Sequence, residues 1–355
     1  MNRGGLETML MNYYRKVDRS KIQFDFMVNR TERGHYDDEI ETLGGKIYRM
    51  PAIRPGNYRK YFRMLDEFFQ KNPEYKVVHS HINENSSFVL RAAKRAGVPC
   101  RIAHSHISDL GLDIKFPFRI YARLAMKEQP NRYFACSNQA GQWLFGKKSQ
   151  EKVIILNNAV NVEEFRFNQN ERVEIRSELN AKDRLVIGHI GRFNKQKNHD
   201  FIIDIFSEVH KIDPTALLVL VGEGHLRDRI EEKVKKLGLT NHVRFLGVRK
   251  DISKLMQGFD LFLFPSLFEG LPVVLVEAQA AGLNCIVSNS ITKETDITGK
   301  LQFLSLKDSP TLWAEKILSS SVDHVDTSQL LQEKGYDTAT MANWLTNFYI
   351  ENTTA

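Results

Sequence analysis

Short apolar runs alternate with amphipathic stretches along almost the whole chain. The runs are rich in β-branched and aromatic residues, a composition typical of buried strands. In the first half they are FDFMV (24–28), KIYRM (46–50), KVVHSH (76–81), RIAHSH (101–106), YFACS (133–137) and VIIL (153–156). In the second half they are LVIGHIG (185–191), ALLVLVG (216–222), VRFLG (243–247), LFLFPS (261–266) and CIVSN (285–289). We predict a strand for each run.

Stretches with apolar residues at helical spacing separate most of these strands. They are Glu7 to Arg15, Asn57 to Phe69, Ser86 to Ala96, Asp200 to His210, Arg227 to Leu237 and Leu271 to Ala281. A last helix is expected over about Tyr336 to Asn352. Strands that alternate with helices of about ten residues predict βαβ units and parallel sheets. The predicted fold class is therefore α/β, with two doubly wound domains.

Length and charge support a division into two domains. A chain of 355 residues suits two domains of ordinary size. The polar segment 157–165 (NNAVNVEEF) reads as a linker, so we expect domains over 1–157 and 158–335. The helix in 336–355 is expected to pack back on the first domain. Residues 1–160 hold 27 Lys and Arg against 16 Asp and Glu, whereas the rest hold 23 against 27. The basic half favours phosphates, lipid headgroups or nucleic acid as partners.

Composition also bears on the cellular compartment in which we expect the protein. The three cysteines (Cys100, Cys136 and Cys285) lie far apart, which argues against a disulfide framework or a zinc site. No apolar run approaches the roughly 20 residues of a membrane span, and MNRGGLETML lacks the apolar core of a secretory signal. We therefore expect a cytoplasmic protein. A nucleic-acid-binding protein is the alternative suggested by the pI of about 9.1, but the basic half lacks an aromatic-interleaved RNA-binding strand.

The N-terminus carries a glycine loop without a strand before it. Gly4 and Gly5 lie in NRGGL (2–6), directly ahead of the first predicted helix. Glycine loops that cradle phosphates normally join a strand to a helix. We therefore expect that the first strand of the N-terminal sheet is missing from this sequence.

The strongest chemical signal is the segment EGLPVVLVE, which follows an apolar strand. Gly270 lets the backbone turn close to a ligand, and Leu271 lies where the next helix opens. Glu269 and Glu277 are spaced to hold two separate pairs of hydroxyl groups, such as those of a sugar and a ribose. The alternative, which spacing alone leaves open, is a Glu that complements a helix dipole and a second, solvated Glu.

Two further loops lie ahead of helices. Gly191, Arg192 and Lys197 lie in GRFNKQKNHDF, where the two cations flank a short turn and can converge on one anion such as a diphosphate. Lys195 in the same loop reads as solvated. Glu223 lies in the Gly-x-Gly turn of VGEGHLRDR, a weaker signal for a wall beside a nucleotide base.

Four histidines end two strands of the basic half. They are His79, His81, His104 and His106. No carboxylate lies at ligand spacing among them and the chain has no Asp-x-Asp, so we expect no metal cofactor. One histidine acting at a reacting sugar is the favoured interpretation, with the other three structural.

Together these segments resemble glycosyltransferase family 4, whose members have the two-domain GT-B fold, and within it the bacterial exopolysaccharide and capsule transferases. The resemblance covers MNRGGLETMLMNYYR, HSHIS, NNAVN, GRFNKQKN, VGEG and EGLPVVLVE. It departs from the family at Asn158-Ala159-Val160, where Asn-Gly-Val is usual. It implies two Rossmann-like domains facing across a cleft, a nucleotide-diphosphate sugar as donor, and transfer with retention of configuration and without a metal.

The resemblance also implies roles for single residues. Arg192 and Lys197 would neutralise the departing diphosphate, Glu269 would hold sugar hydroxyls, and Glu277 would bind the ribose. The other implied contacts are His104 at the transferred sugar, Gly4 and Gly5 at the phosphate and acceptor, and Glu223 beside the base. A saccharide or polyprenyl-linked acceptor is expected, and UDP is the expected nucleotide.

A basic amphipathic segment, FPFRIYARLAMK (116–127), suggests contact with an anionic membrane at its inner face. The alternative is an ordinary surface helix with its apolar side in the core. Within the same fold, a nucleotide-sugar 2-epimerase is the competing activity. A dinucleotide-dependent oxidoreductase is disfavoured because no G-x-G-x-x-G follows a strand.

Overall fold

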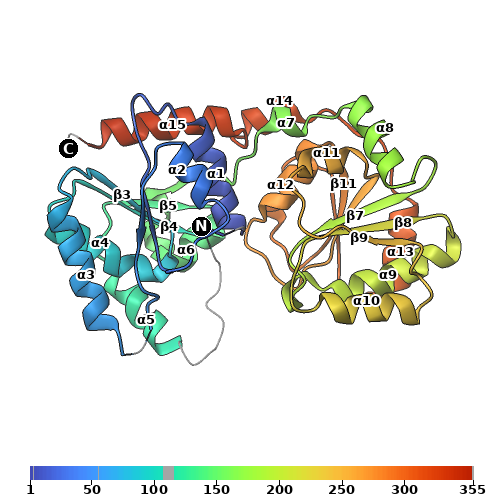
Figure 1. Cartoon of the computed structure of the whole chain (residues 1–355), viewed down its shortest axis with the longest axis horizontal. Coiled ribbons are helices and arrows are strands. Elements are labelled where there is room, and N and C mark those ends of the chain that lie inside the picture. The colour runs from blue at the N-terminus through green and yellow to red at the C-terminus, as the bar shows by residue number, and fades with distance from the viewer. Residues whose placement is uncertain (3, 55, 107–115, 354–355) are drawn as a thin grey trace. The chain divides into compact units, whose positions relative to one another are not determined.

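The computed structural model describes residues 1–2, 4–54, 56–106 and 116–353 (Figure 1). The chain divides into two compact units, one formed by residues 1–159 and 338–355 and the other by residues 160–337. Arg3 of the N-terminal glycine loop, and Ile107 and Ser108 of HSHIS, lie outside the described residues.

The first unit contains two parallel sheets, one of two strands in the order β1-β2 and one of four in the order β3-β4-β5-β6. Its strands are β1 (Phe26–Val28), β2 (Ile47–Arg49), β3 (Val77–Ser80), β4 (Cys100–Ser105), β5 (Arg132–Ala135) and β6 (Val153–Ile155). Its α-helices are α1 (Gly5–Lys16), α2 (Asp37–Thr42), α3 (Tyr58–Lys71), α4 (Ser86–Arg95), α5 (Phe116–Ala125), α6 (Asn138–Phe145) and α15 (Thr338–Glu351), with short 3-10 turns η1 (Asn83–Asn85) and η2 (Lys147–Lys152). Among the described residues, no strand joins β1 to β3.

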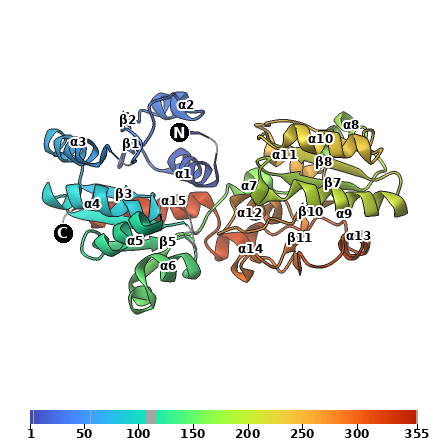
Figure 2. The same cartoon turned by 90° about the horizontal axis from the view of Figure 1, so that it is seen from below.

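Helix α15 packs against α1 within this unit (Figure 2). The unit boundaries fall two residues later than the sequence pattern suggests, at 159/160 and 337/338. Hydrogen bonds account for both shifts. The side chains of Asn12 and Tyr13 on α1 donate to the carbonyl oxygens of Ala159 and Asn157, which keeps that segment in the first unit. The N–H of Val160 donates to the carbonyl of Tyr336, which keeps residues 336–337 in the second.

The second unit is one six-stranded, wholly parallel sheet in the order β12-β11-β10-β7-β8-β9. Its strands are β7 (Val186–Ile190), β8 (Leu217–Val221), β9 (Val243–Phe245), β10 (Leu261–Phe264), β11 (Asn284–Ser288) and β12 (Leu301–Leu304). Its α-helices are α7 (Val162–Phe165), α8 (Gln169–Glu178), α9 (His199–Ile212), α10 (Arg227–Lys236), α11 (Ile252–Gln257), α12 (Val273–Ala280), α13 (Pro310–Leu318) and α14 (Ser328–Glu333), with 3-10 turns η3 (Lys195–Lys197) and η4 (Lys293–Thr295).

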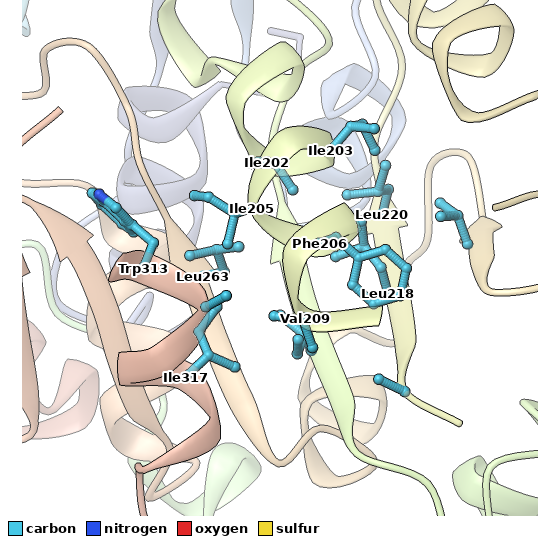
Figure 3. Packing of buried hydrophobic residues seen from close by; sticks show 14 of the residues in the cluster. Ile202, Ile203, Ile205, Phe206, Val209, Leu218, Leu220, Leu263, Trp313 and Ile317 are labelled. Carbon is cyan, nitrogen blue, oxygen red and sulfur yellow. The ribbon is translucent and has the colours of Figure 1, made fainter. Parts of the chain in front are cut away.

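Helices cover both faces of this sheet, with α9, α10 and α13 on one side and α11 and α12 on the other (Figure 1). The core under α9 explains why these strands form. One side of α9 packs against β8, and the side chains in this contact are fully buried (Figure 3). They are Ile202, Phe206 and Val209 on α9, and Leu218 and Leu220 at alternate positions of β8. Burying each such side chain contributes about 1.5–3 kcal/mol relative to leaving it in water.

Candidate functional site

The strand order of the second unit reverses between β7 and β10, which are neighbours in the sheet. Open α/β sheets bind ligands at such a switch point, in the crevice outside the carboxyl ends of the two strands. Gly191 directly follows β7, and Pro265 directly follows β10. The two segments that the sequence singles out for anion and sugar binding therefore begin at the same edge of the sheet.

Two asparagines shape the basic loop after β7. The side-chain oxygen of Asn194 accepts a hydrogen bond from the N–H of Lys197 (3.1 Å), which caps the short turn η3. Asn198 adopts a left-handed conformation (φ 58°), and its side-chain amide donates to the carbonyl of Pro265 (3.1 Å). The loop is thereby tied to the segment after β10, which brings Lys197 next to Glu269.

Lys197 and Glu269 form a mostly buried ion pair. The Lys197 Nζ lies 2.6 Å from Oε1 of Glu269, and the two side chains are 15% and 9% exposed. The same ammonium group lies 4.4 Å from the ring centroid of Phe264, the last residue of β10. An ammonium has three N–H donors, so the pair leaves donors that can meet an anion. A role for Phe264 was not predicted, because in the sequence it is one more apolar residue of a strand.

The glycines of the two loops allow close backbone contact. A Cβ on Gly191 would lie 3.1 Å from the side chain of Lys197, so a larger residue would displace that side chain. Gly222 has φ 134°, and a Cβ there would lie 2.2 Å from the carbonyl oxygen of Gly191. The turn after β8 therefore packs directly against the loop that carries Lys197.

The other predicted residues of this unit lie on the same edge of the sheet. Arg192 is exposed, and so is Glu223, which forms an ion pair with Arg227. Gly270 is half-buried and Leu271 is buried, just ahead of α12.

Glu277 lies on α12 and is half-buried. Burial, with a smaller contribution from the negative charge of Glu164, raises the pKa of Glu277 to about 7. Glu164 comes from the short helix α7, which contacts α12. The approach of Glu164 to Glu277 could not be predicted from sequence, because 113 positions separate the two residues. Perturbed pKa values cluster at functional sites, so this carboxyl group is a candidate ligand-binding group.

Gly4, Gly5 and His104 belong to the first unit. Gly4 is the extended residue that precedes α1, and Gly5 begins that helix. His104 lies inside β4 and is fully buried, while His106, directly after the strand, is half-buried. The contact predicted between His104 and a sugar stays a prediction.

Comparison with known proteins identifies the family of the chain. The profile described as Glycosyltransferase Family 4 matches residues 3–164, and the profile described as Glycosyl transferases group 1 matches residues 170–337. EpsF of Bacillus subtilis (strain 168), a protein named as a glycosyltransferase, is 38% identical over 98% of this chain and 94% of its own length.

Two further relatives carry more specific names. A UDP-Gal:alpha-D-GlcNAc-diphosphoundecaprenol alpha-1,3-galactosyltransferase from Escherichia coli is 27% identical over 75% of this chain and 72% of its own. The crystal structure of Anabaena HepE in complex with UDP superposes with a TM-score of 0.79 at 20% identity, covering 98% of this chain and 96% of that one.

Proposed function

Because this chain belongs to glycosyltransferase family 4, we propose that it transfers a hexose-type sugar from a UDP-sugar donor to a saccharide or polyprenyl-linked acceptor, with retention of configuration. Its fold is GT-B, as the resemblance predicted. The main observation behind the proposal is that the basic loop after β7 contacts the Glu-x7-Glu segment (269–277) after β10, through the ion pair between Lys197 and Glu269. These segments lie at the switch point where doubly wound sheets bind nucleotides.

The proposed mechanism follows from the charges at this edge. The bond between the anomeric carbon and the diphosphate oxygen breaks, so negative charge develops on the diphosphate. Arg192 and Lys197 stabilise that charge, with Lys197 held in place by Glu269 and Phe264. The acceptor oxygen bonds to the anomeric carbon on the face that the diphosphate leaves, and its proton passes to the diphosphate. Glu269 holds sugar hydroxyls and Glu277 holds the ribose.

UDP is the proposed nucleotide, on the strength of two relatives. The Escherichia coli relative is named for a UDP-Gal donor, and the structure of HepE holds UDP. We propose that two fixed cations replace a divalent metal in the transfer step, so that no metal cofactor is needed for it.

The exposed surface of α5 in the first unit supports an acceptor that is bound to a membrane. On α5, Tyr121 and Leu124 are 56% and 73% exposed, and Lys127 is exposed just beyond the helix. Other apolar residues of α5 belong to the core: Ala122 is fully buried in it, and Phe118 packs against the same cluster. No helix of the described residues is long and apolar enough to cross a membrane. We propose peripheral contact of α5 with an anionic bilayer on its cytoplasmic face, where a polyprenyl-linked acceptor would lie.

A thermal-shift titration with UDP, GDP and ADP in EDTA tests the donor site. We expect UDP to raise the melting temperature of the wild type, and Arg192→Ala to remove most of that response, because the planar guanidinium binds phosphate through two donors. Lys195→Ala, in the same loop and exposed, is the matched control and should respond as the wild type does. A wild type that no diphosphate stabilises would contradict the proposal. A response that requires Mg²⁺ would contradict its metal independence.

A further inference from the structure

A buried histidine lies next to the basic loop that follows β7. His189 is the fourth residue of β7 and is fully buried, two positions before Gly191. Its Nδ1 lies 2.8 Å from the carbonyl oxygen of Leu263 on β10, the strand beside β7 at the switch point. A carbonyl oxygen only accepts hydrogen bonds, so Nδ1 carries the proton and donates it. The proposed transfer step gives this residue no role.

The other ring nitrogen of His189 is an acceptor without a donor. Burial, together with the nearby His199 and Lys197, lowers the pKa of His189 well below its usual value, so the ring is neutral at pH 7. In a neutral ring with its proton on Nδ1, the other nitrogen, Nε2, has a lone pair and no proton. Nε2 is buried, and none of the described residues donates a hydrogen bond to it. A buried acceptor without a donor costs free energy, so a donor is expected to reach this nitrogen.

Nε2 of His189 and the side chain of Lys197 lie against the same glycine. A Cβ on Gly191 would lie 3.0 Å from Nε2 and 3.1 Å from Cγ and Cδ of Lys197. Because Gly191 has no side chain, both groups border the same small space. The ammonium of Lys197 lies 4.4 Å from the ring centroid of Phe264, and the ring of His189 stacks on that of Phe264 at 5.7 Å. The two stacked rings therefore border the position that Lys197 occupies.

The hydrogen-bonding groups around Lys197 favour a further acceptor. An ammonium group has three N–H donors. One of them meets Oε1 of Glu269 at 2.6 Å, and the proposed function gives a second to the diphosphate. The third needs an acceptor in a site that is largely removed from water, and the lone pair of His189 needs a donor. A change of rotamer about the terminal bonds of a lysine side chain is enough to redirect its ammonium.

We propose that His189 is a positioning residue for Lys197, an inference that rests on the proposed donor site. When the donor binds, Nε2 of His189 accepts a hydrogen bond from Nζ of Lys197, while Glu269 and the diphosphate accept the other two. The ammonium is then held at three points beside the leaving group. Because His189 is a neutral acceptor, it orients the cation without cancelling its charge, as a second carboxylate would.

Two replacements of His189 separate the roles of its two nitrogens. Asparagine places an amide N–H near the position of Nδ1 and can keep the bond to Leu263, but it has no group at the position of Nε2. Glutamine brings an acceptor oxygen to the position of Nε2 and gives up the bond to Leu263. We expect His189→Asn to weaken UDP binding about tenfold in calorimetry, and His189→Gln to recover most of that loss. A role in packing alone predicts the reverse order, because His189→Asn keeps the bond between the strands.

Combination with Lys197→Ala tests whether His189 acts through that lysine. In the Lys197→Ala chain, His189→Asn should change UDP affinity by less than about twofold, because the group that His189 positions is gone. His324→Asn is the matched control and should leave UDP affinity unchanged. Nδ1 of His324 also meets a carbonyl oxygen, that of Ala281 (2.7 Å), and its Nε2 lies 2.9 Å from the carbonyl oxygen of Phe259. Both partners precede strands, so His324 lies at the amino ends of the strands, opposite the donor site.

UDP binding by the wild type keeps this inference separate from the proposed function. If the wild type does not bind UDP, the donor site fails and this inference fails with it. If the wild type binds UDP, the inference is overturned when folded His189→Asn binds it equally well, or when the loss is as large in the Lys197→Ala chain.

Nitrogen NMR of chains labelled at histidine tests the same bond without replacing His189. UDP should shift an unprotonated ring-nitrogen resonance upfield in the wild type, because that nitrogen then accepts a hydrogen bond. Lys197→Ala should abolish this shift. A wild type that binds UDP without any such shift would overturn the inference.

Discussion

At the scale of single residues, the Lys197–Glu269 ion pair links stability and ligand binding. Its two charges are largely removed from water, so the loss of either one would leave the other buried without a compensating charge. Such a pair is a natural place for a diphosphate, because the incoming anion meets a cation that is already positioned. Its geometry depends on Phe264 under the ammonium and on the asparagines that close the loop.

Lys197→Ala should lower kcat by about 10²–10³, the cost of losing one group that stabilises charge in a transition state. It should also lower the melting temperature, because Glu269 is left in a nearly buried position without its cation. Thermal denaturation and sugar-transfer kinetics measure the two effects. Adding Glu269→Gln to Lys197→Ala should recover stability but not activity. Full recovery of activity in the double variant would contradict the role given to Lys197.

The raised pKa of Glu277 predicts that the stability of the fold depends on pH. The folded chain keeps this carboxyl protonated up to about pH 7, whereas the unfolded chain ionises it near its ordinary pKa of 4.5. The contribution to stability is therefore complete below pH 4.5 and is lost as the pH rises through 7. The melting temperature of Glu277→Gln, relative to the wild type, should rise by a few degrees from pH 4.5 to pH 8.

Glu174→Gln, on the exposed side of α8, is the control for this titration and should show no such trend. Glu277→Gln should also weaken the thermal response to UDP at pH 8, because there Glu277 is ionised and a carboxylate accepts ribose hydroxyls better than an amide does. A melting-temperature difference that stays constant across this pH range would show that Glu277 does not titrate as described.

At the scale of elements, most strands follow from the alternation of apolar and polar positions, because a parallel strand buried on both faces is a continuous apolar run. The strand β12 was not predicted. It is only four residues long, pairs with one neighbour and exposes Gln302, so its apolar signal is weak. The neighbour of β12, the strand β11, was predicted, but the sequence does not show that residues 301–304 pair with it.

Part of the candidate site could also be predicted from local sequence, whereas the rest depends on contacts between distant segments. Loops that follow a strand and precede a helix could be read directly, since each lies within about ten residues. The seating of Lys197 on Phe264 and the pairing of Glu277 with Glu164 depend on which strands and helices become neighbours. The four histidines of the first unit are intermediate, because spacing places them on one face of the sheet but only the pairing of β3 with β4 brings them side by side.

The packing of two loops predicts the effect of a glycine substitution. Gly222→Ala would place a Cβ 2.2 Å from the carbonyl oxygen of Gly191, in a backbone conformation that side chains rarely adopt. The basic loop must then move, so we expect loss of the UDP response and destabilisation by about 2–4 kcal/mol. Gly238→Ala is the control: its φ is also positive (74°), but its Cβ would meet no atom within 4 Å. It should cost about 1 kcal/mol and leave UDP binding intact. If both variants lost the same stability and the same UDP response, backbone strain alone would explain the effect and the contact with Gly191 would not.

At the scale of the whole molecule, the two halves of the sequence differ in charge. The basic half contains α5 with its exposed apolar residues, whereas the second half has more acidic than basic residues. Charge attracts such a surface to anionic lipids over about a Debye length, and apolar side chains then anchor it. A chain whose described residues contain no helix able to span a membrane can in this way reach an acceptor with a lipid tail.

Vesicle co-sedimentation tests this arrangement. The wild type should bind vesicles that contain phosphatidylglycerol, bind phosphatidylcholine vesicles weakly, and dissociate at high salt. Leu124→Glu should weaken binding to the anionic vesicles at least about tenfold, because burial of a leucine contributes about 1.5–3 kcal/mol and the added charge is repelled. Leu124 is 73% exposed, so its replacement should not disturb the core.

Val173→Glu is the matched control for that variant, because Val173 is 60% exposed on α8 of the second unit. If it weakens vesicle binding as much as Leu124→Glu does, the added negative charge alone explains both effects and α5 is not the contact. If only Leu124→Glu weakens binding while its UDP response is unchanged, membrane contact and donor binding reside in different units. Activity on a lipid-linked acceptor should then fall with vesicle binding, whereas activity on a water-soluble acceptor should not.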